Sequence, residues 1–280
     1  MSGPFAGRFT RAFLMFGVLP LLFIAGVQLF VLSAQTATFF AWTINPPLTA
    51  AFLGAGYWSA LSAAYMALRR TDWSTTGTSL LASFAATTML GIATFLHLDR
   101  FHLASPLLIT RFVTWVWIAV YVVTPPIFLV ILIRKLRVGK AAASADGRPG
   151  WLHIGYLLQA LYGVVVGLAL FILPGSVIPS WPWLLTPLTA QVVGTWLTSY
   201  GLVSAAISGE KDLRNSSGTI SSLLVFCILQ LVVIARYFSA IDWSKPLTWI
   251  YMVFLLGGMG CAVAALRDER KKLPAAMPAA

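Results

Sequence analysis

Charged residues are scarce in this chain, and acidic residues are the scarcest of them. Asp, Glu, Lys and Arg together make up 10% of the 280 residues, and only 8 residues are Asp or Glu. A soluble domain carries about 25% charged residues, so the composition excludes an ordinary soluble domain. What the chain has instead is apolar, since 59% of its residues are hydrophobic and its mean hydropathy is +0.86. These values predict an integral membrane protein with several membrane spans.

Cysteine and histidine are nearly absent, with 2 and 3 residues. Cys227 and Cys261 fall inside predicted spans and show no paired spacing, so we expect neither a structural disulfide nor a zinc site. A membrane haem needs two histidines that face each other from different helices. His97 and His102 lie close together near one predicted membrane face and His153 near the other, so we expect no haem and no other cofactor.

Catalytic motifs with a sharp spacing are also missing. The chain has no serine elbow and no helix with paired histidines. No charged residue falls near the middle of a predicted span, where a proton relay needs one. The pattern favours a protein that is not an enzyme and holds no metal. Two alternatives stay open: a metal held by His97, Asp99 and His102, since imidazole and carboxylate are ordinary zinc ligands, and a lipid-modifying enzyme in which one of these histidines is the base.

Eight apolar runs are long enough to cross the hydrocarbon core of a membrane as helices, which takes about 20 residues each. The runs are continuous and lack the short alternation of barrel strands. We therefore predict an all-α, polytopic membrane protein with about eight transmembrane helices. The expected spans are residues 12–34, 48–68, 76–98, 107–133, 151–174, 187–207, 218–238 and 247–266.

The basic residues lie mostly on one side of this arrangement. With the N-terminus inside, only 4 of the 19 basic residues fall on the outer side, namely Arg100, Arg111, Arg236 and Lys245. Cytoplasmic loops retain Lys and Arg, so we expect both termini to be cytoplasmic. The net charge of +11 then reflects topology and attraction to anionic headgroups. Nucleic acid is not an expected partner, because no basic segment outside the membrane is long enough to hold a duplex.

The chain repeats itself at an offset of 140 residues, which is half its length. Pro47-Leu48-Thr49-Ala50 recurs as Pro187-Leu188-Thr189-Ala190. At the same offset, Gly54, Ser59 and Asp72 match Gly194, Ser199 and Asp212. Because the matches keep their order, they indicate an internal duplication. We predict two four-helix membrane repeats, residues 1–140 and 141–280.

The number of spans in each repeat predicts how the repeats are oriented. Four is an even number, so the second repeat enters the membrane in the same orientation as the first, and the two repeats are parallel. The link between them, Arg134 to Gly150, is basic and rich in small residues, and we expect it on the cytoplasmic side. Duplicated membrane units often form a site between their halves.

Two corresponding outer segments, Gln35 to Pro46 and Pro174 to Thr186, carry no charge at all. Their prolines exclude a regular helix. Their aromatic residues are Phe39, Phe40, Trp42, Trp181 and Trp183. Since such rings favour the headgroup boundary, the segments either anchor the chain at the outer interface or fold back as caps over an outward-facing cavity.

The strongest cluster of ionisable residues lies on the same outer side. Arg111 is about one turn, roughly 6 Å, inside its predicted span, and ionisable residues within spans usually mark a site. We predict an outward-facing ligand site from residues of both repeats, with Lys245 nearby. Its residues are His97, Asp99, Arg100, His102, Arg111, Arg236 and Asp242. The alternative is that Arg111 reaches the headgroups or pairs with Asp99.

Three functions fit these features. The first is transport of a small solute, or sensing of a ligand, through a polar site between the repeats. The polar residues at mid-depth, such as Gln28, Ser59, Gln191 and Tyr200, are neutral and favour a neutral or anionic solute. The second is an accessory or structural subunit of a membrane complex. The third is the lipid-modifying enzyme of the outer leaflet named above.

The string Trp181-Pro182-Trp183-Leu184-Leu185-Thr186-Pro187-Leu188-Thr189 resembles segments of bacterial membrane proteins that have no assigned activity. The resemblance implies the cytoplasmic membrane of a bacterium as the location and implies no activity. The expected partners are membrane lipids, together with a membrane-protein partner or a second copy of the chain in the accessory role.

Overall fold

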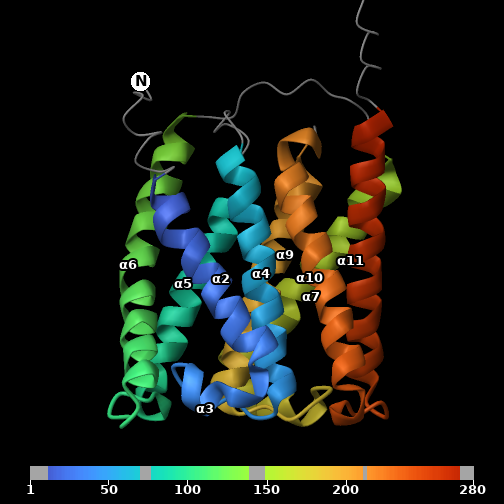
Figure 1. Ribbon diagram of the computed structural model, residues 1–280. Coiled ribbons are helices and arrows are strands. Elements are labelled where there is room, and N and C mark those ends of the chain that lie inside the picture. The colour runs from blue at the N-terminus through green and yellow to red at the C-terminus, as the bar shows by residue number, and fades with distance from the viewer. Residues whose placement is uncertain (1–11, 70–76, 139–148, 211–212, 272–280) are drawn as a thin grey trace, which may run out of the picture.

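The computed structural model describes residues 12–69, 77–138, 149–210 and 213–271. Within these ranges the chain forms helices, turns and one isolated bridge between Trp42 and Phe101, with no strand. Figure 1 shows long helices that run side by side and alternate in direction along the chain. The prediction of an all-α protein is confirmed.

A long helical segment occupies each of the eight predicted ranges. The first is α2 (Leu19–Gly26), extended by the π-helical turns η1 (Phe13–Val18) and η2 (Val27–Val31). The others are α4 (Pro47–Arg69), α5 (Gly77–Leu96), α6 (Leu108–Val138), α7 (Gly150–Ile172), α9 (Pro187–Gly209), α10 (Ser217–Arg236) and α11 (Pro246–Lys271).

The short helices gather at one end of the bundle, the lower end in Figure 1. We call this the lower end and define it by residues 32–46, 97–107, 173–186 and 237–245. Its elements are η3 (Ser33–Gln35), α3 (Thr36–Phe39), η5 (Leu98–Arg100), α8 (Pro174–Val177), η6 (Ile178–Ser180) and η8 (Phe238–Ala240). The opposite, upper end contains η7 (Leu213–Ser216) and the C-terminal ends of α4, α6, α9 and α11.

Five of the long helices are long and apolar enough to cross a membrane: Leu14–Val31, Leu108–Arg134, Gly150–Ile172, Ser217–Arg236 and Pro246–Asp268. These helices make the chain an integral membrane protein with several spans. The apolar part of α5, Leu80–Leu96, is shorter, and α4 and α9 are less apolar.

The position of α4 and α9 in the bundle explains their weaker hydropathy. All residues from Leu48 to Tyr57 in α4 and from Leu188 to Gly201 in α9 are buried. A helix that is surrounded by protein does not need an apolar surface toward lipid, and its Thr and Ser hydroxyls can bond to helix carbonyls. Thr195 and Ser199 of α9 do so, donating to the carbonyls of Gln191 and Thr195 at 2.9 and 2.8 Å.

Both central helices begin at the motif that repeats in the sequence. Pro47 and Pro187 are the first residues of α4 and α9, the position where a missing N–H costs nothing. At α9, the hydroxyl of Thr186 accepts from the amide of Thr189 at 3.3 Å, and the hydroxyl of Thr189 accepts from the amide of Thr186 at 2.8 Å. This reciprocal cap fixes the start of α9.

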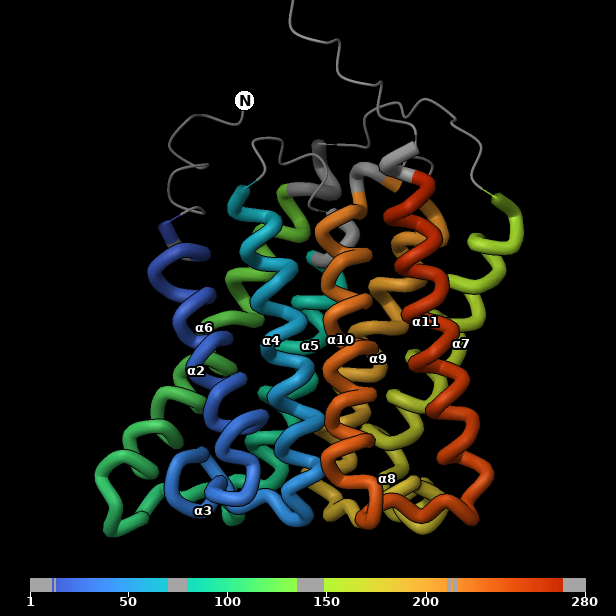
Figure 2. The backbone as a smooth tube through the Cα atoms, turned by 45° about the vertical axis from the view of Figure 1, so that its right-hand side comes forward, coloured from blue at the N-terminus to red at the C-terminus, as the bar shows by residue number. Residues whose placement is uncertain are grey.

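The two halves of the chain interlock rather than form separate bundles. Helix α4 packs against α2 of its own half and against α10 of the other, and α9 packs against α7 and, across the halves, against α5. Figure 2 shows α10 between α4 and α11. Helix α6 packs against α5, and α11 packs against α10. Helices α4 and α9 also contact each other, in the middle of the bundle. We call the contacts of α4 with α9 and α10 the seam.

Glycines bring α7 and α9 into close contact. A Cβ atom at Gly163 would lie 2.7 Å from the Cα atom of Gly201, and one at Gly194 would lie 2.9 Å from the Cβ atom of Leu170. The Gly163-x-x-x-Gly167 motif therefore packs helices within the second half, because only a residue without a side chain permits this approach.

Candidate functional site

The imidazole of His102 forms hydrogen bonds with residues 40 and 43, in the segment that precedes α4. Its Nδ1 lies 3.1 Å from the carbonyl oxygen of Phe40, and its Nε2 lies 3.0 Å from the hydroxyl of Thr43. Because a carbonyl oxygen only accepts, we assign the proton to Nδ1 and let Nε2 accept from Thr43. The amide of His102 also donates to the carbonyl of Ala41 at 2.9 Å. Both ring nitrogens of His102 are thus engaged within the protein.

His97 connects the two halves of the chain. Its Nε2 lies 3.0 Å from Oε1 of Gln191 in α9, and Nε2 of Gln191 donates to the carbonyl of Phe171 at 3.1 Å. This chain of bonds joins the end of α5 to α9 and α7. His97 and His102 therefore have different partners, and among the described residues no three His, Cys, Asp or Glu side chains lie together as a metal site.

Three of the predicted site residues in the first half, Asp99, Arg100 and Arg111, are exposed. Asp99 pairs with Arg100 at 3.0 Å, but the two side chains are 69% and 72% exposed, so the pair adds little stability. Arg111 is exposed near the start of α6. Within the described ranges the ion pair of Asp99 is with Arg100 and not with Arg111.

In the second half, the two basic residues of the outer cluster donate to backbone carbonyls. Nη1 of Arg236 donates to the carbonyl of Phe30 at 2.7 Å, at the end of the first long helix. Nζ of Lys245 donates to the carbonyl of Trp181 at 2.8 Å and lies 3.9 Å from Asp242. Bonds from the hydroxyl and the amide of Ser244 hold the pKa of Asp242 below its usual value. The structure thus pairs Asp99 with Arg100 and Asp242 with Lys245, while His97, His102 and Arg236 each bind a different segment.

The two uncharged segments fold back against the helices. Trp42, Trp181 and Trp183 are only 2%, 0% and 3% exposed, so their rings are surrounded by protein. Trp42 packs on the rings of Phe101 and Trp117, with centroids 5.0 and 4.9 Å away. We call the two segments, residues 35–46 and 174–186, the plugs.

The second plug also reaches across the halves. Nε1 of Trp183 donates to the hydroxyl of Thr49 in α4 at 3.0 Å. The rings of Phe52 in α4 and Tyr251 in α11 lie 5.9 and 5.8 Å from the ring of Trp183. These contacts show that the second plug packs against the helices, whereas a cavity beneath the plugs remains a prediction.

Deeper in the bundle, hydroxyl groups from both halves meet at the seam. Oγ of Ser59 in α4 donates to the carbonyl of Ser222 in α10 at 2.6 Å, and Oγ of Ser222 donates to the carbonyl of Ser59 at 2.9 Å. The hydroxyl of Tyr200 in α9 bonds to Oγ of Ser59. Ser59 and Tyr200 stood out in the sequence as neutral polar residues at mid-depth. Ser222 did not, because nothing in the sequence pairs it with Ser59.

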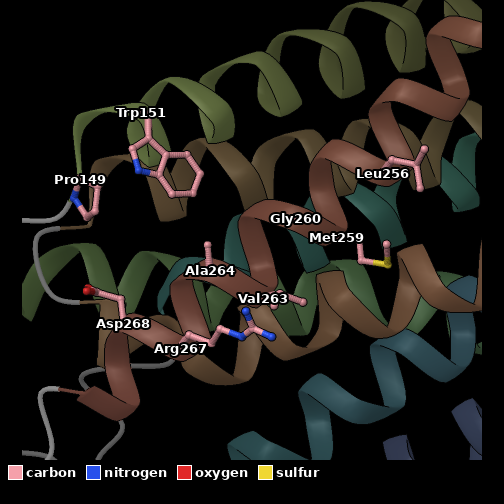
Figure 3. Close-up of a pocket in the computed structure, with 9 residues that line it drawn as sticks. All are labelled: Pro149, Trp151, Leu256, Met259, Gly260, Val263, Ala264, Arg267 and Asp268. Carbon is pink, nitrogen blue, oxygen red and sulfur yellow. The ribbon is translucent and has the colours of Figure 1, made fainter.

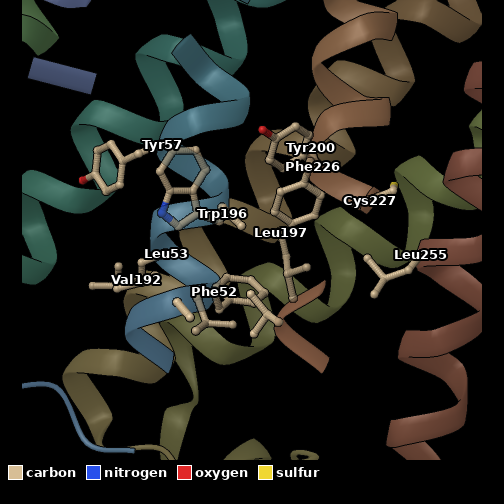
Figure 4. Packing of buried hydrophobic residues seen from close by; sticks show 14 of the residues in the cluster. Phe52, Leu53, Tyr57, Val192, Trp196, Leu197, Tyr200, Phe226, Cys227 and Leu255 are labelled. Atoms are coloured by element: carbon tan, nitrogen blue, oxygen red, sulfur yellow. The ribbon is translucent and has the colours of Figure 1, made fainter. Parts of the chain in front are cut away.

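Aromatic rings fill the space beside these hydroxyls, as Figure 4 shows for Tyr57, Trp196, Tyr200 and Phe226. The Trp196 ring centroid lies 5.1 Å from that of Tyr57 and 6.3 Å from that of Tyr200. A Cβ atom at Gly56 would lie 2.7 Å from the indole of Trp196, so this glycine makes room for the ring. Gly56 and Trp196 are 140 residues apart, the same offset at which Pro-Leu-Thr-Ala recurs in the sequence.

Several buried polar atoms at the seam and at the plugs have no hydrogen-bond partner among the described residues. They include Nε1 of Trp42, Trp181 and Trp196. Trp196 is 6% exposed. A buried donor without a partner costs about 1–3 kcal/mol unless water or a ligand meets it. The indole N–H of Trp196 is thus a buried hydrogen-bond donor that has no partner within the part of the chain that the structure describes.

No family model matches this chain, and no curated protein and no solved structure is similar to it. Its function therefore has to be inferred from its own residues.

Proposed function

We propose that residues 1–140 and 141–280 are parallel repeats, that all eight long helices cross the membrane, and that the upper end faces the cytoplasm. Helices α4 and α9 are each 23 residues long, α5 and α10 are each 20, and in both pairs the second helix begins 140 residues after the first. Corresponding helices run in the same direction in Figure 1. Arg69, Arg134 and Arg267 lie near the C-terminal ends of α4, α6 and α11, at the upper end.

The function that we propose is binding and transport of a small neutral polar solute at the seam. The single observation that carries this proposal is the buried indole N–H of Trp196, which has no hydrogen-bond partner among the described residues. Its ring lies 6.3 Å from the ring of Tyr200, whose hydroxyl belongs to the network of Ser59 and Ser222. All these groups are uncharged at neutral pH, so they can bond to a hydroxyl or amide of a solute without burying a charge. The predicted ligand residues at the lower end then belong to the entrance.

The route that we propose leads from the lower end past His97 and Gln191, between the plugs. The bond between His97 and Gln191 joins α5 to α9 at the lower end, at one side of the seam. Each plug is held by several hydrogen bonds, such as Lys245 to Trp181 and His102 to Phe40, and by contacts between buried aromatic rings. In this route a plug moves when these bonds and ring contacts open together, while the long helices keep their positions.

Swelling of proteoliposomes tests this proposal. Vesicles with and without the full chain are exposed to gradients of glycerol, erythritol or urea, and light scattering follows solute entry. We expect faster entry of at least one solute with the protein. Trp196→Phe keeps the ring but removes the N–H, so the added rate should fall about fivefold, the equivalent of one hydrogen bond of ~1 kcal/mol.

The matched control is Trp249→Phe, since Trp249 is 58% exposed on α11 and its N–H bonds to the carbonyl of Trp243. This variant should keep the rate of the parent. Vesicles that swell no faster with the protein than without it, for all three solutes, would overturn the transport function.

The accessory subunit remains the second candidate, because the observed contacts of His97, His102, Arg236 and Lys245 all fasten segments of this chain to each other. Purification from native membranes in a mild detergent separates the two functions. Co-purification of one membrane protein in fixed ratio, together with absence of swelling, would favour the subunit. The lipid-modifying enzyme has less support, since both ring nitrogens of His102 are already bonded.

A further inference from the structure

A groove opens on the outer flank of the second half, between the start of α7 and the C-terminal part of α11 (Figure 3). Its volume is about 560 Å³, and its lining includes Trp151 on α7 and Leu256, Gly260, Arg267 and Asp268 on α11. The groove exists partly because Gly260 has no side chain, and a Cβ atom built there would meet nothing within 4 Å. It lies away from the seam and from the plugs, so the transport route does not use it.

The polarity of the groove changes along its length. Leu256 and Trp151 are 48% and 58% exposed, so the groove presents apolar surface outward. Charged residues occur only at its upper end, where Arg267 and Asp268 follow each other near the end of α11. Figure 3 shows Trp151 and Arg267 on opposite sides, one from each helix.

The length of the groove matches one leaflet of a bilayer. Leu256 and Arg267 are 11 residues apart on α11, which corresponds to about 16 Å along a helix with a rise of 1.5 Å per residue. Half of a hydrocarbon core roughly 30 Å thick is about 15 Å. With Arg267 at the headgroups, Leu256 therefore lies near the middle of the membrane, where an acyl chain ends. Trp151 lies at the boundary that tryptophan prefers.

We propose that this groove binds one phospholipid with a zwitterionic aminoalkyl phosphate headgroup, of the phosphatidylethanolamine type. The phosphate bonds to the guanidinium of Arg267, the ammonium bonds to the carboxylate of Asp268, and an acyl chain runs over Gly260 to Leu256. The headgroup supplies one charge of each sign, and the groove offers the complementary charge to each. A carboxylate has about four acceptor sites, so Asp268 can bind an ammonium in addition to its other interactions.

A second copy of this chain fits the groove less well. A helix laid over Gly260 would cover Arg267 and Asp268 and remove them from water, which is costly for charged groups. A lipid leaves its headgroup and both side chains at the wet surface. The groove is also narrow in extent, so it offers little area for a stable protein interface.

Native mass spectrometry of the full chain tests the proposal. The purified protein is titrated with phosphatidylethanolamine, phosphatidylglycerol and phosphatidylcholine of equal acyl length. We expect one site that prefers phosphatidylethanolamine. Gly260→Leu fills the groove and removes contact with at least two lipid methylenes at ~0.8 kcal/mol each, so binding should weaken about tenfold. Gly175→Leu is the matched control, because Gly175 in α8 at the lower end also has nothing within 4 Å of a built Cβ atom.

Two charge variants test the headgroup assignment. Arg267→Gln should weaken binding of all three lipids, whereas Asp268→Asn should weaken phosphatidylethanolamine alone and make phosphatidylglycerol the better ligand. Ala264→Phe, which narrows the groove one turn above Gly260, is the second filling variant if Gly260→Leu fails to fold.

Three results would overturn the proposal. The first is equal binding of all lipids by the parent and by both filling variants. The second is a preference for phosphatidylglycerol in the parent. The third is a dimer that the filling variants convert to a monomer while lipid binding stays unchanged, which would assign the groove to a second copy.

Discussion

The side chain of His102 contributes to the fold through hydrogen bonds to residues far away in the sequence. Its ring joins the segment after α5 to the carbonyl of Phe40 and the hydroxyl of Thr43, both about 60 residues earlier. Buried aromatic rings lie next to this contact, because Trp42 packs on Phe101. Loss of the imidazole would release the first plug and open the aromatic cluster to water.

We predict that His102→Ala lowers the free energy of unfolding by about 2 kcal/mol, since two side-chain hydrogen bonds of ~1 kcal/mol each are lost. Arg100→Ala, two residues away, should change it by less than ~0.5 kcal/mol, because its ion pair with Asp99 is exposed. Thermal unfolding in detergent, followed by tryptophan fluorescence, measures both. Equal effects of the two variants would contradict the anchoring role of His102.

Replacing Ser59 should lower the stability of the protein, because its buried hydrogen-bond partners would lose a bond. Ser59→Ala removes the hydroxyl that bonds to Tyr200 and to the carbonyl of Ser222, and Ser222 and Tyr200 are 5% and 4% exposed. We predict a loss of about 1–3 kcal/mol in the free energy of unfolding. Ser62→Ala is the control, since Ser62 only donates to the carbonyl of Ser59 within the same helix. A stable Ser59→Ala protein would show that water replaces the hydroxyl.

Among the elements, the pair α7 and α9 depends most on the absence of side chains. A Cβ atom at Gly163 would also lie 2.7 Å from the carbonyl oxygen of Leu197 in α9. We predict that Gly163→Ala costs about 1–3 kcal/mol, because the contact is with backbone that cannot rotate away. A Cβ atom at Gly260 on α11 would meet nothing within 4 Å, so Gly260→Ala should leave the free energy of unfolding unchanged. Unfolding midpoints of the two variants compare them, and similar midpoints would mean that α7 and α9 separate easily.

The long helices could be predicted from the sequence, but their arrangement in the bundle could not. Hydropathy predicts the positions of the long helices to within a few residues, since lipid and protein interior both favour apolar residues there. It does not predict the central position of α4 and α9, because burial by other helices is a property of packing. The short helices α3 and α8 were expected only as irregular segments, since their prolines and aromatic residues are compatible with several local conformations.

At the candidate site, the sequence indicates which ionisable residues lie at the outer side, but it does not predict their hydrogen-bond partners. His97, Arg236 and Lys245 bind Gln191, the carbonyl of Phe30 and the carbonyl of Trp181. Phe30 and Arg236 are 206 residues apart, and a carbonyl oxygen is present at every residue, so the sequence carries no signal for such a bond. A ligand role for the seven predicted residues remains a prediction that the swelling and binding measurements address.

Across the whole molecule, the interlocked order of helices makes the orientation of one half depend on the other. Helix α4 packs on α10 and α9 packs on α5, so halves inserted in opposite directions would place the plugs at opposite ends and break these contacts. We therefore expect positions that are 140 residues apart, such as Arg69 and Gly209 or Ala104 and Ser244, to lie on the same side of a membrane. All four residues are exposed.

Single cysteines test this arrangement in intact cells. In a background where Cys227 and Cys261, both buried, are replaced by Ala, the variants Ala104→Cys and Ser244→Cys should react with an impermeant maleimide from outside. Arg69→Cys and Gly209→Cys should react only after the cells are opened. Parallel insertion with cytoplasmic termini requires both results, because the first pair lies at the lower end and the second pair at the upper end. Labelling of Ala104→Cys and Ser244→Cys from opposite sides would contradict the parallel halves, and with them a seam built from both.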